Sequence, residues 1–296
     1  MRLLIALLLA AACQNSPATQ VETQPLVGKP QDPKPAKPKQ PAKAKPKRPV
    51  VVPPGAYLLQ YRFPEGLIYD ETTVRDFYLE LVSGDKRVVY RVGSKESFRR
   101  TIVESSGDGP PEVERVQVVQ MVRSVTQSAT EDANEKVDAA QGRSFVWRKR
   151  GDDWFLYDSA GDAGGRFPRL VERLRNWREA RLPPKPVKPG ESWEVTAKAF
   201  LETAGQPLPP ELQGSARFKL EEVTDGVARI TFTFGYRWAS GPPTNMEMSA
   251  DGEGVWRFDV KNGRELGLEM KSTILAGDSG KGRASQKRTV EYGAKR

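Results

Sequence analysis

The chain has 296 residues, no histidine, one cysteine and a formal net charge of +9. Without histidine it lacks the usual general base near neutral pH, the usual zinc ligand and every Ser-His-Asp or Cys-His arrangement. A single cysteine forms neither an internal disulfide nor a CxxC site. The composition argues against an enzyme, and we expect no cofactor and no metal site.

Residues 1–12 have the pattern of a secretory signal peptide. Arg2 provides a positive charge, an apolar run extends from Leu3 to Leu9, and three alanines precede Cys13. The apolar run is about half as long as a membrane-spanning helix. We therefore expect this segment to direct export and not to cross a bilayer as a permanent anchor.

The sequence Ala10-Ala11-Ala12-Cys13 resembles a bacterial lipobox, although leucine is commoner than alanine at the position of Ala10. The resemblance implies cleavage before Cys13 and acylation of its thiol and new amine by fatty acids such as palmitate. Two or three acyl chains hold a protein firmly on a membrane. Gln14, where aspartate would imply retention at the inner membrane, implies sorting to the outer membrane. The alternative is an ordinary secreted protein with a chance cysteine.

Residues 13–55 form a Pro/Lys-rich spacer with few large apolar side chains. Such a segment buries too little surface to offset its conformational entropy, so we expect it to be disordered. In extended polyproline II form, at roughly 3.1 Å per residue, about forty residues reach roughly 120 Å. The spacer is either a soluble stalk or a contact for lipid headgroups or an anionic envelope polymer such as peptidoglycan.

The spacer also carries most of the positive charge of the chain. Residues 29–49 have a net charge of +7, which leaves only +2 for residues 50–296. A basic folded domain is typical of nucleic-acid binding. Because this domain is nearly neutral, we expect no nucleic-acid partner.

Residues 56–296 have the composition of a β-rich globular domain, with possible halves at 56–180 and 191–296. In the first half, apolar periodicity predicts strands over the segments 57–63, 76–82, 87–93 and 115–125, and a hairpin over 144–158 that turns at Gly151. The pair Val118-Val119 interrupts the alternation and predicts a β-bulge.

Two segments of the first half have helical features. The segment 168–184 predicts a helix that begins at Pro168 and ends before Pro183-Pro184, with Leu170, Leu174 and Trp177 on one face. The segment 130–141 predicts a weaker helix or a loop.

The clearest hairpins lie in the second half, around Asp225-Gly226 and Asn262-Gly263, which are favoured turn pairs. Large aromatic side chains share one predicted face of these hairpins, and we call them the aromatic stripe. The stripe consists of Phe232, Phe234, Tyr236, Trp238, Trp256 and Phe258. It is either an ordinary core or the lining of an apolar groove for a lipid or another hydrophobic ligand.

Carboxylates also gather in the sequence, at Asp152, Asp153, Asp158 and Asp162. Paired carboxylates serve in glycoside hydrolysis and in calcium binding. The spacing here does not match an EF-hand loop, and the first two residues fall at a predicted hairpin tip. We therefore interpret the four as solvated turn residues.

The segment "LPPKPVKPGESW" resembles an element that precedes the C-terminal sheet in a family of bacterial secreted and lipoprotein domains. The matching positions are Pro183, Pro186, Val187, Gly190 and Trp193. The resemblance covers about residues 56–293 and implies no activity. It implies an architecture similar to envelope carriers of lipid cargo.

The sequence thus predicts a mainly β (α+β) fold, a curved antiparallel sheet or half-barrel with one or two capping helices. The predicted function is a non-catalytic binding role in the bacterial cell envelope, for a hydrophobic or lipid ligand. The alternative is a structural module that scaffolds an envelope protein or a peptidoglycan partner.

Overall fold

A computed structural model describes residues 52–83, 86–106, 110–126, 134–151, 153–174, 181–202, 211–239, 247–278 and 280–293. The predicted signal peptide, Cys13 and the predicted spacer up to residue 51 lie outside these ranges. The elements and contacts of the molecule are those of the residues in these ranges.

Thirteen strands form one antiparallel sheet that does not close into a barrel. The strands are β1 (Ile68–Ser83), β2 (Lys86–Glu104), β3 (Val113–Thr126), β4 (Asn134–Val137), β5 (Ser144–Arg150), β6 (Asp153–Asp158), β7 (Gly161–Asp162), β8 (Ser192–Thr196), β9 (Gln213–Thr224), β10 (Val227–Ala239), β11 (Glu247–Asp259), β12 (Arg264–Ala276) and β13 (Gly280–Tyr292). Two short helices are α2 (Pro168–Leu174) and α3 (Ala197–Glu202).

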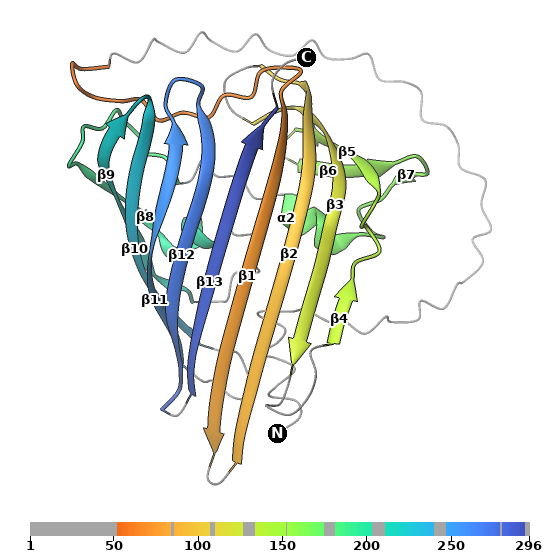
Figure 1. Ribbon diagram of the computed structural model, residues 1–296, viewed down its shortest axis with the longest axis vertical. Helices are drawn as coiled ribbons and strands as arrows, with labels where there is room; N and C mark the ends of the chain where they lie inside the picture. Colours follow the sequence, from red (N-terminus) through yellow and green to blue (C-terminus); the bar gives the residue numbers. More distant parts are fainter. Residues whose placement is uncertain are drawn as a thin grey trace.

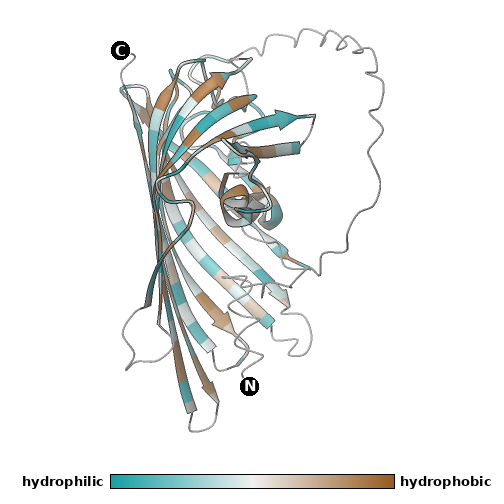
Figure 2. Ribbon diagram, turned by 90° about the vertical axis from the view of Figure 1, so that its right-hand side faces the viewer, coloured by the Kyte–Doolittle hydropathy of each residue, from teal (hydrophilic) through white to brown (hydrophobic). Residues whose placement is uncertain are grey.

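The spatial order of the strands is β7-β6-β5-β3-β2-β1-β13-β12-β11-β10-β9-β8, and β4 pairs with β3. The first and last long strands, β1 and β13, therefore lie side by side in the middle of the sheet, and β5–β7 and β8–β9 curl away at its two sides (Figure 1). Helix α2 lies on one side of the sheet (Figure 2). We call that side the inner face and the opposite side the outer face.

The predicted capping helices are not borne out. Two extended segments cover the centre of the inner face instead, and paired backbone hydrogen bonds between Tyr57 and Val187, at 2.8 and 3.0 Å, join them. Four prolines between residues 183 and 189 exclude a helix in the second segment. The segment is fixed to the sheet because the indole Nε1 of Trp193 donates to the carbonyl of Arg181 at 2.7 Å.

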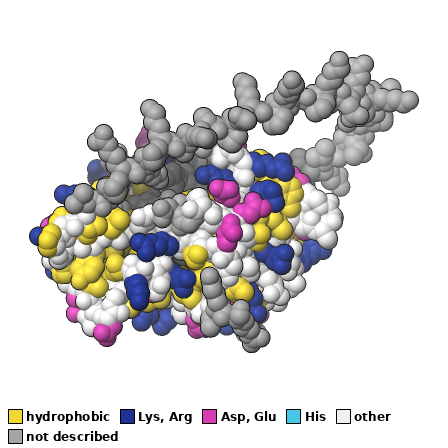
Figure 3. Space-filling model, turned by 90° about the horizontal axis from the view of Figure 1, so that it is seen from above, with side chains coloured by type: hydrophobic (Ala, Val, Ile, Leu, Met, Phe, Trp, Pro, Cys, Tyr) yellow, Lys and Arg dark blue, Asp and Glu magenta, His cyan; other side chains and the backbone are white. Residues whose placement is uncertain are grey.

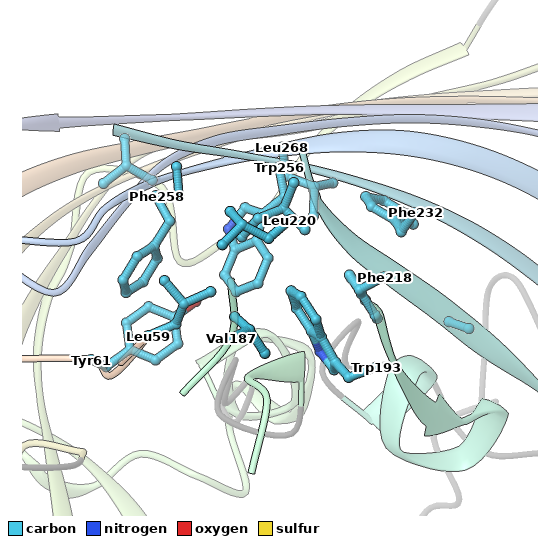
Figure 4. Close-up of a cluster of buried hydrophobic side chains, with 14 of the residues drawn as sticks. Leu59, Tyr61, Val187, Trp193, Phe218, Leu220, Phe232, Trp256, Phe258 and Leu268 are labelled. Atoms are coloured by element: carbon cyan, nitrogen blue, oxygen red, sulfur yellow. The ribbon is translucent and has the colours of Figure 1, made fainter. Parts of the chain in front are cut away.

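Three clusters of apolar side chains lie on the inner face. The central cluster joins β8–β13 to the two covering segments, and in Figure 4 Leu59, Tyr61 and Val187 lie opposite Trp256 and Phe258. A second cluster packs α2 against strands β2, β3, β5 and β6. A third draws its residues from the strands alone, including Leu79, Tyr90 and Ile274. Long strands with one apolar face therefore need little helix to build this core.

Several local predictions are confirmed. The hairpin β9–β10 turns at Asp225-Gly226, where both residues have positive φ (52° and 79°), and β5–β6 turns at Gly151. The register of β2 against β3 skips Val119, which is the predicted bulge. These features depend on a few adjacent residues, so the local sequence is sufficient to predict them.

Other local predictions are wrong. The segment 57–63 is one of the covering segments and not a strand of the sheet, and part of the segment 130–141 is strand β4. The described part of the predicted 168–184 helix is α2 alone, and Trp177 lies outside the described residues. Helix α3 was not predicted. None of the helices within the described ranges is long and apolar enough to cross a membrane.

Candidate functional site

The outer face carries polar side chains in rows that run across the strands, because paired residues of neighbouring antiparallel strands point to the same side. The first row consists of Lys219, Thr231, Val255, Glu269, Lys287 and Val74. The second consists of Arg217, Thr233, Glu253, Lys271, Ser285 and Asp76. The third consists of Asp251, Thr273, Arg283, Tyr78, Arg91 and Thr126.

These rows line two adjoining hollows. The first and second rows line a hollow of about 770 Å³, and the second and third rows line one of about 990 Å³. Five residues line both hollows and make them continuous, namely Asp76, Thr233, Glu253, Lys271 and Ser285. We call the combined hollow the outer groove. From β8 to β3 it crosses on the order of 35–40 Å of sheet, at 4.7–4.9 Å per strand.

Short side chains explain why the outer face is hollowed here. Thr233, Ser285, Gly93 and Gly235 occupy positions between longer charged side chains. A Cβ on Gly93 would lie 2.7 Å from Ser124 Oγ, and one on Gly235 would lie 2.7 Å from Asp251 Oδ1. The neighbouring polar groups thus lean over the two glycines, and larger residues there would displace them.

Charges along the groove alternate in sign. Lys271 Nζ lies 3.0 Å from Glu253 Oε1, and Lys287 Nζ lies 2.9 Å from Glu269 Oε1. These pairs are well exposed, so each contributes little to stability and stays accessible to a ligand. At the upper end of the molecule, seen from above, separated Lys and Arg side chains lie between hydrophobic patches (Figure 3).

At one side of the groove a carboxylate is held ionised. Lys219 Nζ donates to Glu221 Oε2 at 2.8 Å, and Thr231 Oγ1 donates to Glu221 Oε1 at 2.7 Å. These hydrogen bonds, the one from Lys219 first, lower the pKa of Glu221. The groove therefore offers hydroxyl groups and charges of both signs, which suit a polar ligand.

The predicted aromatic stripe lies on the inner face, in the core. Phe232 and Phe234 are 2% and 5% exposed, and Trp256 and Phe258 are fully buried. The Phe232 ring centroid is 5.1 Å from that of Phe218, and Phe234 lies 5.0 Å from Phe200 of α3. Of the six stripe residues, Phe232 alone belongs to the lining of the outer groove.

The end of the stripe at Tyr236 and Trp238 packs against the third apolar cluster. Tyr236 and Trp238 are partly exposed, with ring centroids 5.5 Å apart. Burial raises the pKa of Tyr236 to about 12, so its phenol stays protonated until strongly alkaline pH. Whether any stripe residue contacts a ligand remains a prediction.

Glycines opposite the stripe explain its packing. The rings of Phe232 and Phe234 lie over Gly254 and Gly252 of the neighbouring strand, where an added Cβ would lie 2.3 Å from either ring. The aromatic rings fill the space that the glycines leave on the inner face. This arrangement is typical of a packed core.

A row of buried charges on the inner face was not predicted. Its members alternate in sign across five neighbouring strands, and each is at most 7% exposed. In strand order they are Glu114, Arg100, Glu71, Arg288 and Glu265. The shortest N–O distances from Arg100 are 3.0 Å to Glu114 and 3.7 Å to Glu71. Those from Arg288 are 3.4 Å to Glu71 and 3.6 Å to Glu265. We call it the buried charge row.

Two tyrosines support this row. Tyr69 Oη donates to Glu114 Oε1 at 2.9 Å, and Tyr61 Oη donates to Glu265 Oε2 at 3.2 Å. A slip of one residue in any of the five strands would move its charge to the outer face and leave its neighbours without their partners. We therefore interpret the row as a device that fixes strand register.

The aspartates that gather in the sequence between residues 152 and 162 do not form a metal site in the part of the chain that the structure describes. Asp158 Oδ1 accepts hydrogen bonds from Arg166 Nη2 and from the backbone N–H of Ala160, both at 2.8 Å. The Arg166 contact is the main cause of a lowered pKa at Asp158. Asp162 accepts from the N–H of Gly164, and Asp152 lies outside the described residues. Across the ranges described, no three side chains of metal-ligating type gather.

Comparisons with known proteins give only distant similarities. No protein-family model and no curated protein matches the chain. A structure titled for lipid–protein interactions in lipovitellin is 7% identical, with a TM-score of 0.45, and covers 77% of this chain and 25% of its own. The chain thus spans about a quarter of the lipovitellin chain. The structure of DynF from the dynemicin biosynthesis pathway of Micromonospora chersina is 9% identical, with a TM-score of 0.22. The match covers 82% of this chain and 92% of the DynF chain.

The fold class of this chain is mainly β. At these TM-scores neither similarity carries an argument about function.

Proposed function

We propose that this chain is a lipid-anchored protein of the bacterial cell envelope, sorted to the outer membrane. In this proposal the sheet domain has a non-catalytic role and binds a polar, carboxylate-bearing glycan polymer such as peptidoglycan in the outer groove. Cys13 holds the acyl chains, and the basic spacer lets the domain reach the polymer.

The observation that supports the proposal is the continuous outer groove. It is open, crosses most of the sheet and presents hydroxyl groups and accessible charges of both signs. An extended polar polymer can follow such a surface along its length. Most of the aromatic stripe, which would suit an acyl chain, is buried on the inner face instead.

Filling the groove tests the proposal. We expect Thr233→Ile combined with Ser285→Ile to weaken binding to isolated peptidoglycan sacculi about five-fold or more, because two hydroxyl groups are lost and larger apolar groups fill the centre. The full chain, purified from membranes in mild detergent, is cosedimented with sacculi, and the free fraction is measured.

The matched control carries two Thr→Ile substitutions outside the groove, Thr101→Ile and Thr289→Ile, at positions that also lie on the outer face. We expect the control to bind like wild type. If the groove variant also binds like wild type, the groove is not the site and the spacer accounts for binding. If wild type instead binds vesicles of phosphatidylethanolamine and phosphatidylglycerol but not sacculi, the polymer is the wrong ligand and the hydrophobic-ligand prediction is favoured.

The anchor has a separate test. We expect Cys13→Ser to abolish incorporation of labelled fatty acid, because this is the single cysteine of the chain. The variant should also be released from membranes, so that it is recovered in the soluble fraction without detergent. Labelling that persists unchanged in the variant would show that Cys13 is not the acylated residue.

A further inference from the structure

Tyr78 in the third row lies between two arginines. Its register partners are Arg91 of β2 and Arg283 of β13. The guanidinium carbons lie 5.7 and 5.5 Å from the Tyr78 ring centroid, so both make cation–π contacts with one ring. The phenol donates to Glu80 Oε2 at 2.8 Å, which holds the ring in place.

The two arginines differ from the lysines of the groove. Lys219, Lys271 and Lys287 each pair with a glutamate. In contrast, neither Arg91 nor Arg283 forms an ion pair with any residue that the structure describes. Glu80, which accepts the hydrogen bond from Tyr78, pairs with a different arginine. Glu80 binds Arg87 at 2.8 Å.

Two further acids face this part of the groove. Asp251 lies on β11, two strands from Arg283, and leans over Gly235. Asp76 precedes Tyr78 by two residues on the same face and is paired in register with Ser285 and Gly93. Two positive charges therefore flank Tyr78 with acids only at diagonal positions.

We propose that Arg91 and Arg283 form a binding site for an anionic group of the ligand, a carboxylate or a phosphate. Guanidinium groups bind both anions through paired N–H donors. Hydroxyl groups of Ser124, Thr126 and Ser285 line the same hollow and supply further donors. This inference rests on the proposed function and assigns the chemistry that the groove recognises.

The test compares the full-length wild type with Arg91→Gln, Arg283→Gln and the double variant, using isolated sacculi as the probe. Arg257→Gln, on the same face but outside the groove, is the matched control. We expect about ten-fold weaker binding for the double variant, a smaller dependence on salt, and no change for the control. Equal affinity and equal salt dependence in the double variant and wild type would overturn the anion site.

Two treatments identify the anion. Loss of binding after amidation of the sacculus carboxylates assigns a carboxylate. Binding that survives amidation but is displaced by inorganic phosphate assigns a phosphate. Binding that neither treatment affects contradicts the inference. If the double arginine variant binds normally while Thr233→Ile with Ser285→Ile does not, the groove function stands and only the anion site is wrong.

Discussion

Arg100→Met is expected to lower the free energy of unfolding by about 3–5 kcal/mol. Arg100 lies between Glu71 and Glu114 in the buried charge row, and all three side chains are at least nine-tenths buried. Removing Arg100 leaves the buried Glu114 without its ion-pair partner in the row and leaves Glu71 paired in the row with Arg288 alone, which costs far more than an exposed pair is worth. Urea unfolding followed by tryptophan fluorescence measures the change.

The neighbouring Arg99 is the control. Its side chain points to the outer face and forms a bidentate pair with Asp70, at 2.9 and 3.0 Å, in an exposed position. We expect Arg99→Met to shift the urea midpoint very little. Equal midpoints for the two variants would mean that the row does not stabilise the sheet.

Phe232→Ala is expected to destabilise the domain by about 3–5 kcal/mol, the usual cost of truncating a fully buried phenylalanine. The ring lies over Gly254 and packs against Phe218 and Phe200, so its loss opens a cavity that no neighbour can fill without a backbone shift. Thermal and urea unfolding of the full chain measure the loss.

Phe155→Ala is the matched control, since Phe155 is among the exposed large hydrophobic residues. We expect a much smaller loss of stability there. If Phe232→Ala retains full stability and instead loses a hydrophobic ligand detected by native mass spectrometry, the aromatic stripe is a ligand site and not core.

The sequence is most informative where a feature depends on neighbouring residues. Alternation in the β9–β10 and β11–β12 segments predicts which aromatic residues share a face, and Val119 marks the bulge. Simple alternation fails at one point, where the register between β11 and β12 shifts. A bulge opposite Arg257 and Phe258 brings Glu265, and not Leu266, into line with Phe258 on the inner face.

Features that join distant parts of the chain could not be predicted. The buried charge row joins five strands, and nothing near Glu71 or Arg288 in the sequence indicates that they meet. The outer groove depends equally on the order of the strands. The segment 57–63 alternates like a strand, but its apolar side chains pack in the central cluster and its backbone pairs with Val187.

The central position of the β1–β13 pair also determines when the sheet can be completed. Roughly 200 residues of chain separate the partners in this ladder, so most of the protein has to be synthesised before the middle of the sheet can form. Until then β1 and β12 are long strands with unpaired edges, which invite pairing with other chains. The slowest step of folding should therefore be the docking of two preformed meanders, and a chain truncated before β13 should aggregate.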